Sequence, residues 1–177
     1  MKDSDIKRLD DGIRDVPDFP KPGIIFKDIT PVLGDGDLFR LSIDGFIETA
    51  HNEEVTKIIG IDARGFIFGA AVADRLGIGF VPIRKKGKLP WETEGIAYSL
   101  EYGEAEVEVH RDAIAPGEKV MMVDDLLATG GTAGAALALV ESLGGDVVCA
   151  TFLIELEFLN GRHNLPDDVR VEALLTY

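Results

Sequence analysis

The segment KVMMVDDLLATGGTAGAALALVESLGG, residues 119–145, restricts the possible folds more than any other part of the chain. Val120–Val123 is a short and fully apolar run, which is typical of a strand buried on both faces. Ala133–Leu143 is rich in alanine and leucine and is followed by two glycines, so it predicts a helix that ends near Gly144. Two aspartates, two threonines and two glycines separate strand from helix, and such a polar connection is suited to holding a ligand.

Strand and helix patterns alternate through the middle of the chain. Helices are expected at Asp3–Arg14, Asp37–His51 and Phe66–Leu76, and strands at Lys57–Ile61, Phe80–Ile83, Ile96–Leu100, Ala105–Val109, Asp146–Glu155 and Val169–Leu175. Alternation of this kind predicts an α/β fold with a mostly parallel, twisted sheet flanked by helices. The 177 residues contain no repeat and no linker, so we expect a single domain.

Three local details complete this outline. Asp37 is the expected cap of the second helix. The four prolines between Val16 and Pro31 predict an irregular, extended arm. Glu155 is expected to face solvent or a partner subunit, because it alternates with Glu157 around the end of a strand.

Charge and composition exclude several classes of protein. The net charge of −14 argues against nucleic-acid binding and against anionic membranes. No apolar run approaches the roughly 20 residues that span a bilayer, and the charged N-terminus does not resemble a signal peptide. The single cysteine, Cys149, lies in an apolar run and is expected to be a buried thiol, which fits a reducing cytoplasm.

Polar residues follow three of the expected strands, and the carboxyl ends of parallel strands meet at one edge of a sheet. The three segments are Asp62–Gly65, the cluster of Arg84, Lys85, Lys86 and Lys88, and Asp124–Thr132. Glycines at a helix N-terminus suit a phosphate group, adjacent carboxylates can accept hydrogen bonds from vicinal hydroxyls, and arginine suits a second phosphate. Together they outline phosphoribosyl pyrophosphate (PRPP). Taken singly, the same residues could be a tight turn, a helix cap and a solvated basic turn.

The segment VMMVDDLLATGGTA, residues 120–133, resembles the PRPP motif of type I phosphoribosyltransferases. Four further segments resemble the members of that family that act on adenine: PDFPKPGIIFKDITPVL at 17–33, DARGFIFG at 62–69, IRKKGKLP at 83–90 and YSLEYGEAEVE at 98–108. The resemblance implies the type I fold with a small N-terminal hood, residues 1–33. It also implies purine salvage, in which adenine and PRPP give AMP and diphosphate with Mg²⁺, and a cytoplasmic homodimer.

The resemblance also implies roles for individual residues. Ribose and its 5′-phosphate would be bound by Asp124, Asp125, Ala128, Thr129, Gly130, Gly131 and Thr132. Diphosphate would be bound by Ala63, Arg64, Gly65, Arg84, Lys85 and Lys88. Adenine would be bound by Ile25, Phe26, Lys27 and Leu126. The catalytic residues would be Glu101, Arg64 and Tyr102, of which Glu101 and Tyr102 would lie in a lid formed by residues 86–102. No side chain is implied as a direct metal ligand, since Mg²⁺ would be held mainly through PRPP and water.

Ala128 bears on the choice of base. The related enzymes for 6-oxopurines carry a third aspartate at this position, and alanine cannot exchange a proton, so hypoxanthine and guanine are expected to be poor substrates. A 6-oxopurine or xanthine enzyme that uses Glu101 instead is the alternative. Two non-enzymatic alternatives are a transcriptional regulator that binds PRPP, against which the net charge of −14 argues, and a structural nucleotide-binding subunit.

Replacing the expected proton-exchanging residue tests the resemblance directly. Glu101→Gln should lower kcat by roughly 10²-fold or more, the usual scale for general acid–base catalysis. Steady-state kinetics with adenine and PRPP would measure this change. An unchanged kcat would remove Glu101 from the mechanism.

Overall fold

The computed structural model describes residues 1–50, 53–99 and 104–177. Its strands are β1 (Arg14–Pro17), β2 (Ile25–Asp28), β3 (Lys57–Ile61), β4 (Gly79–Lys85), β5 (Thr93–Ser99), β6 (Glu104–His110), β7 (Lys119–Leu127), β8 (Asp146–Glu155) and β9 (Arg170–Thr176). Its helices are α1 (Asp3–Asp11), α2 (Thr30–Gly34), α3 (Gly36–Thr49), α4 (Arg64–Leu76) and α5 (Gly131–Ser142), with 3₁₀ turns η1 (Glu157–Leu159) and η2 (Gly161–Asn164).

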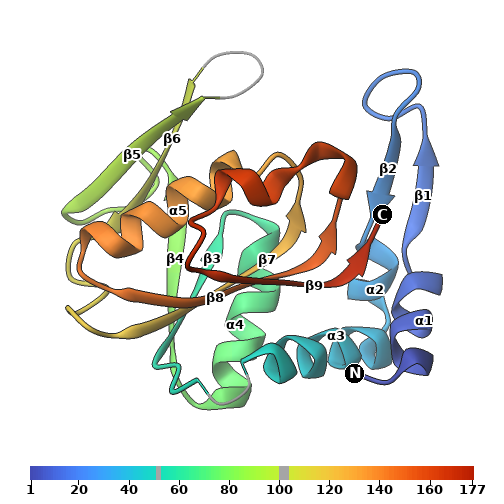
Figure 1. Cartoon of the computed structure of the whole chain (residues 1–177), viewed down its shortest axis with the longest axis horizontal. Coiled ribbons are helices and arrows are strands. Elements are labelled where there is room, and N and C mark those ends of the chain that lie inside the picture. The colour runs from blue at the N-terminus through green and yellow to red at the C-terminus, as the bar shows by residue number, and fades with distance from the viewer. Residues whose placement is uncertain (51–52, 100–103) are drawn as a thin grey trace.

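A seven-stranded sheet in the order β5-β6-β4-β3-β7-β8-β9 carries the site (Figure 1). All pairs within the row β4-β3-β7-β8-β9 are parallel. Strand β6 runs antiparallel to β4 and forms a hairpin with β5. The expected mostly parallel α/β sheet is therefore confirmed. Because the parallel strands end at the same edge, the segments that follow β3, β4 and β7 are brought together there.

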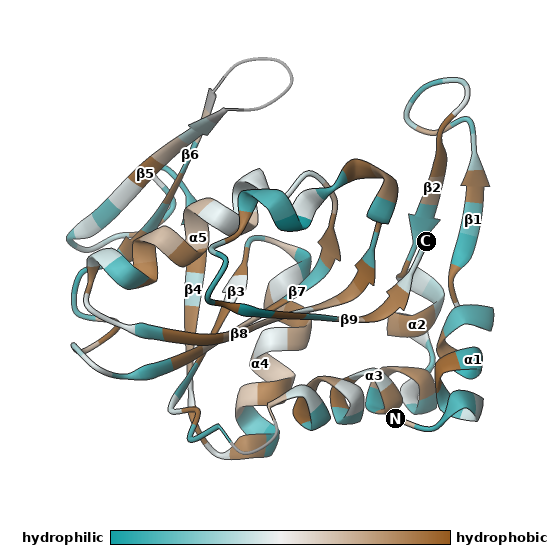
Figure 2. Ribbon diagram, in the orientation of Figure 1, coloured by the Kyte–Doolittle hydropathy of each residue, from teal (hydrophilic) through white to brown (hydrophobic). Residues whose placement is uncertain are grey.

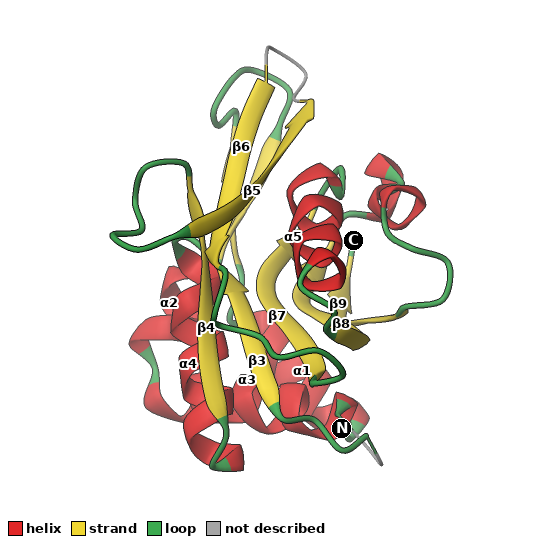
Figure 3. Cartoon of the chain, turned by 90° about the vertical axis from the view of Figure 1, so that its left-hand side faces the viewer, coloured by secondary structure: helices red, strands yellow, loops and turns green. Residues whose placement is uncertain are grey.

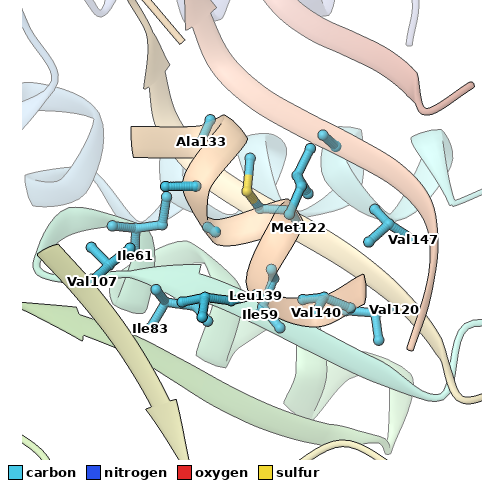
Figure 4. Packing of buried hydrophobic residues seen from close by; sticks show 14 of the residues in the cluster. Ile59, Ile61, Ile83, Val107, Val120, Met122, Ala133, Leu139, Val140 and Val147 are labelled. Atoms are coloured by element: carbon cyan, nitrogen blue, oxygen red, sulfur yellow. The ribbon is translucent and has the colours of Figure 1, made fainter. Parts of the chain in front are cut away.

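Helices cover both faces of the sheet (Figure 3), and each face has its own apolar core. Helix α5 covers one face with small side chains such as Ala136 and with Leu139, which pack on Ile59, Met122 and their neighbours (Figure 4). Helices α3 and α4 cover the other face with larger rings, including Phe46. In α1 and α3 hydrophilic and hydrophobic residues alternate around the helix (Figure 2), as expected for helices with one solvated face. Among the described residues, no helix is long and apolar enough to cross a membrane.

The proline-rich arm differs from the prediction. Instead of being irregular, residues 14–28 form an antiparallel hairpin in which Arg14 pairs with Asp28 and Pro17 with Ile25, followed by the short helix α2. The prediction is wrong because the prolines lie at the end of β1, in the turn and in the first turn of α2, so all of β2 keeps its N–H donors.

Strand β7 is longer than the apolar run that predicted it. It continues to Leu127 because β8 pairs with it as far as Glu155, so Asp124 and Asp125 lie inside the strand instead of after it. Glu155 is also placed differently from the expectation. Only 4 % of its surface is exposed, and its carboxylate is paired with Arg162.

The cap of α3 is Asp35 and not Asp37. The carboxylate of Asp35 accepts hydrogen bonds from the N–H groups of Asp37 and Leu38 at 2.9 and 3.0 Å, whereas Asp37 pairs with Arg40 on the surface. These N–H groups are free at the start of any helix, and satisfying them lowers the pKa of Asp35.

Replacing the cap should destabilise the fold measurably. Asp35→Ala should lower the thermal unfolding midpoint by about 2–4 °C at pH 7, because two helix N–H groups lose their acceptor. Asp37→Ala is the matched control and should leave the midpoint nearly unchanged. Because the pKa of Asp35 is lowered in the folded state, the stabilisation is present above the ordinary range of aspartate and is lost as the pH falls through the folded pKa. Equal midpoints for the two variants would contradict the assignment.

Candidate functional site

Two adjacent carboxyl groups form the centre of the site. Asp124 and Asp125 lie near the carboxyl end of β7, and only 6 % of the surface of Asp125 is exposed. The N–H of Asp125 donates to Oδ1 of Asp124 at 2.9 Å. Arg64, in the first turn of α4, places its Nε 2.7 Å from Oδ2 of Asp125. The pair therefore shares one close cation.

The surroundings make it hard for both acids to be charged. Burial raises the pKa of Asp124 well above its usual range, and repulsion by the neighbouring carboxylate of Asp125 adds to this. Burial also raises the pKa of Asp125, although the guanidinium of Arg64 works in the opposite direction. Such a pair is primed to accept hydrogen-bond donors, because each donor that arrives stabilises the charged form.

The loop between β3 and α4 packs directly on this acid pair. A Cβ added to Gly65 would lie 2.6 Å from Oδ1 of Asp124, so only glycine fits there. A Cβ on Gly60 would in turn lie 2.8 Å from the carbonyl oxygen of Gly65. These close approaches hold residues 62–65 against the end of β7, and they place Arg64 beside Asp125.

The glycine loop, residues 128–132, joins β7 to α5. Gly130 has a φ of +79°, which glycine adopts without steric cost, and Gly131 begins the helix. Together with Asp124 and the adjoining residues 126, 127 and 133, the loop lines a small pocket at the N-terminus of α5. Unpaired N–H groups and the helix dipole make this pocket favourable for an anion. The hydroxyl of Thr132 also donates to the hydroxyl of Tyr98 on β5 at 3.1 Å.

A second cavity adjoins the pocket of the glycine loop. It has a volume of about 350 Å³ and is lined by Ile61–Arg64, Asp124–Leu126 and Thr132. That volume lies within the usual range for small-molecule sites. Asp124, Leu126 and Thr132 line both cavities, so the acid pair lies at the junction of the two.

A larger groove of about 730 Å³ lies between α1 and β9, away from these residues. Lys7 is the one cation among its lining residues, and it is paired with Asp11 at 2.9 Å. Size alone would favour that groove, but converging polar groups favour the acid pair and the glycine loop as the site.

The basic loop, residues 84–88, begins with the last two residues of β4, the strand that flanks β3 on the side opposite β7. Arg84 donates to Asp62 at 3.0 Å and to the carbonyl oxygen of Lys88 at 3.1 Å, so it ties the two loops together. Lys86 pairs with Glu106 at 2.7 Å. In the described part of the chain no ion pair involves Lys85 or Lys88, which leaves these two ammonium groups for an anion.

Glu108 fixes the start of the segment that follows β4. Only 6 % of its surface is exposed, and its carboxylate accepts the N–H groups of Lys88 and Leu89, each at 3.1 Å. The hydroxyl of Thr93 approaches the same carboxylate at 3.4 Å. Glu108 of β6 therefore anchors the carboxyl end of the basic loop.

The hood meets the site through Phe26. The ring centroid of Phe26 lies 6.0 Å from the guanidinium carbon of Arg64, and Phe19 packs edge-on against Phe26 at 5.2 Å. Lys27 points elsewhere, since its ammonium lies 2.7 Å from Asp15 and 3.7 Å from the ring centroid of Tyr177. Ile25 is exposed.

The structure thus brings together most of the residues that the sequence singled out. Glu101 and Tyr102 lie outside the described residues. Sequence reasoning included Asp62 in a polar segment of the site but gave it no role, and it missed Tyr98, Glu108 and Asn164, the last of which donates to the carbonyl oxygen of Thr129 at 2.7 Å. Arg84 directly follows the expected strand Phe80–Ile83, and nothing in the sequence near it indicates that Asp62 is its partner. No local spacing marks the other three residues.

The donor set is compatible with a metal that arrives on a ligand. In the described ranges, no group of three or more His, Cys, Asp or Glu side chains is arranged to hold a metal ion. Asp124 and Asp125 nevertheless offer carboxylate oxygens beside a cavity. Mg²⁺ commonly binds proteins through one or two carboxylates plus substrate phosphates and water, so the residues present fit that mode.

Comparison with known proteins assigns this arrangement to a family. The model of the phosphoribosyl transferase domain matches residues 35–168. The adenine phosphoribosyltransferase of Nitrosococcus oceani is 54 % identical over 97 % of this chain and 100 % of its own. The crystal structure of adenine phosphoribosyltransferase from Rhodothermus marinus superposes with a TM-score of 0.94 at 52 % identity, covering 99 % of this chain and 100 % of that one. The Saccharomyces cerevisiae enzyme, complexed with an imino-altritol bisphosphate and adenine, has a TM-score of 0.92 at 40 % identity, with coverages of 97 % and 98 %.

Removing one charge from the acid pair should stabilise the protein. Asp124→Asn keeps the acceptor for the N–H of Asp125 but removes a poorly solvated carboxylate, so at pH 8 the free energy of unfolding should rise by about 1 kcal/mol or more. Because the folded pKa of Asp124 is raised, the gain should shrink as the pH falls through that pKa, and it should vanish below the ordinary range of aspartate, where the wild-type acid is protonated in both states.

Urea unfolding of both proteins at pH 5 and pH 8 would measure this. Asp125→Asn is the comparison variant, since it also removes the partner of Arg64 and should gain less. A pH-independent difference between Asp124→Asn and wild type would contradict the raised pKa.

Proposed function

The chain belongs to the adenine phosphoribosyltransferase family and makes AMP and diphosphate from adenine and PRPP; we propose the following roles for its residues in that reaction. The observation that carries the proposal is the position of the acid pair. Asp124 lies at the junction of the pocket at the glycine loop and the larger cavity beside Arg64. A ribose ring with a phosphate at each end fits a site of this shape.

Asp124 and Asp125 accept hydrogen bonds from the 2- and 3-hydroxyls of the ribose. Their raised pKa values support this role, because hydroxyl donors offset the missing solvation of a buried carboxylate. The glycine loop binds the 5′-phosphate through N–H groups at the start of α5 and through the hydroxyl of Thr129, and the hydroxyl of Thr132 joins them by turning from Tyr98 to the phosphate. Ala128 contributes a main-chain group only.

The diphosphate lies between the β3–α4 loop and the basic loop. Arg64 uses Nε for Asp125, and a guanidinium has four further N–H donors for phosphate oxygens. Ala63 and Gly65 offer main-chain N–H groups, while Lys85 and Lys88 add charge. Arg84 acts chiefly by joining the two loops, since its guanidinium is hydrogen-bonded to Asp62 and Lys88.

Adenine binds between Phe26 of the hood and Leu126 of β7, and main-chain groups of Ile25 and Lys27 read its edge. The side chain of Lys27 is occupied by Asp15 and Tyr177, which supports a role for its main chain alone. We also propose that residues 1–33 act as the hood of a single domain.

Cleavage of the bond from C1 to diphosphate leaves positive charge on the ribose, as in glycoside hydrolysis. Arg64 and the basic loop stabilise the departing negative charge, and the hood and acid pair hold N9 of adenine close to C1. We assign Glu101 to proton exchange with the purine ring and Tyr102 to the same segment, on the resemblance of residues 98–108 alone.

Mg²⁺ would be bound mainly by the phosphate oxygens of PRPP and by water, next to Asp124 and Asp125. When bound, it would neutralise part of the charge on diphosphate. No role of a protein residue given above depends on a direct bond to the metal.

We also propose that the protein is a homodimer and that it is cytoplasmic. Family resemblance supports a homodimer, which sedimentation equilibrium would test. The buried, unpaired thiol of Cys149 is compatible with a reducing cytoplasm, and fractionation of the source cells would test that location.

Turnover of single bases tests the proposed function. Purified protein with PRPP and Mg²⁺ should form AMP from adenine, with a kcat/KM roughly 10²-fold or more above that for hypoxanthine, guanine or xanthine, because Ala128 offers no group to exchange a proton with a 6-oxopurine. Chromatography of the nucleotide products would measure the rates. Comparable rates with hypoxanthine, or no AMP from adenine, would overturn the proposal.

A further inference from the structure

The segment after β8 passes directly beside the glycine loop. Its second 3₁₀ turn, η2 (Gly161–Asn164), follows Asn160, which has a φ of +52°. The carboxamide nitrogen of Asn164 donates to the main-chain carbonyl oxygen of Thr129 at 2.7 Å, across 35 residues of sequence. The carbonyl can only accept, so the NH₂ side of the carboxamide must face it. We call residues 160–164 the brace.

The brace and the glycine loop touch backbone to backbone. A Cβ added to Gly161 would lie 2.2 Å from the carbonyl oxygen of Ala128, and a Cβ on Gly130 would lie 2.1 Å from that of Gly161. A Cβ on Gly134, one turn into α5, would lie 2.3 Å from the carbonyl oxygen of Asn164. No side chain separates the two segments at these points, so a shift of one backbone is passed directly to the other.

The brace is itself tied to the sheet. Arg162 binds both carboxylate oxygens of Glu155, at 2.7 and 2.6 Å, and donates to the carbonyl oxygen of Val171 at 2.8 Å. Glu155 is buried at the end of β8, and Val171 lies on β9. Two-point contacts between arginine and carboxylate fix orientation as well as distance. The brace therefore connects the glycine loop to the rigid edge of the sheet.

We propose that Asn164 is a positioning residue for the 5′-phosphate of PRPP, acting with Gly161 through the peptide between Thr129 and Gly130. This inference rests on the proposed function. That peptide bond is trans, so its C=O and N–H point in opposite directions. Asn164 holds the C=O from outside, since it is not among the residues that line the pocket of the glycine loop. The N–H of Gly130 is thereby turned to the opposite side, toward the pocket.

Without the hydrogen bond from Asn164, this peptide can rotate, because glycine at position 130 imposes little restriction of its own. An N–H donor would then be lost from the phosphate site, or a carbonyl oxygen would face the phosphate. Either change weakens binding of PRPP and of AMP. Neither affects the adenine pocket, which is built from the hood and Leu126. The proposal thus separates binding of the phosphate from binding of the base.

Three variants test the proposal. Asn164→Ala removes the donor, and Asn164→Asp keeps the size of the side chain but replaces the donor with an acceptor. His163→Ala is the matched control, because His163 is an exposed neighbour in the same turn. In steady-state assays, Asn164→Ala should raise the KM for PRPP roughly 5- to 10-fold, and Asn164→Asp at least as much. The KM for adenine should stay within about 2-fold of wild type, and His163→Ala should match wild type throughout.

Two results would overturn the proposal. One is a fall in the unfolding midpoint with both KM values unchanged, which would make the contact merely structural. The other is an equal loss for PRPP and adenine. Calorimetric titration of PRPP into the same four proteins measures binding without turnover. If the wild type forms no AMP, the proposed function is wrong. If all four proteins bind PRPP with equal affinity, the role proposed for Asn164 is wrong. If Asn164→Ala and Asn164→Asp both raise the KM for PRPP, misfolding of one variant cannot explain the result.

Discussion

The two adjacent carboxyl groups at the end of β7 are the constraint around which the site is organised. Burial and mutual repulsion oppose their ionisation, and the close cation is Arg64, held at 2.7 Å from Asp125. Placing Arg64 there requires α4 to begin directly at the end of β3, and it requires Gly65 to have no side chain. The parallel order β4-β3-β7 brings the basic loop, the β3–α4 loop and the glycine loop to the same edge of the sheet as the acids.

A protein that keeps such a pair gives up stability for binding. A carboxylate with too little solvation gains most from a ligand that brings hydroxyl donors, and the same carboxylate destabilises the empty fold. The surrounding structure is correspondingly well fixed. The β3–α4 loop is joined to the basic loop by Arg84, the basic loop is anchored by Glu108, and the glycine loop is backed by Asn164.

Local patterns predicted the elements well where periodicity was strong. Strands β3 and β8 begin and end where the sequence indicates, and α4 begins two residues early. The errors have a common cause in long-range contacts. Glu155 occupies a position that alternation assigns to solvent, yet Arg162 covers it from a remote segment. The apolar run predicted too short a β7 because Asp124 and Asp125 interrupt it, while pairing with β8 continues the strand to Leu127. Similarly, most of the candidate site could be predicted because its ligating groups follow strands in compact motifs, whereas the residues that support those groups come from distant segments with no motif of their own.

The hood has one further property, which concerns the order in which the chain is made. The side chain of Lys27 packs on the ring of Tyr177, whose hydroxyl donates to Asp10 at 2.5 Å, and Figure 1 shows that end of the chain beside β2. Tyr177 is held in place by β9 and Glu155, so the hood gains this support only after the far edge of the sheet has formed. At roughly 5–20 residues per second, a ribosome needs about 8–30 s to pass from Lys27 to Tyr177. During that interval the nascent hairpin lacks its neighbour, so the segment that we propose to bind adenine is completed late in biosynthesis although its residues emerge early.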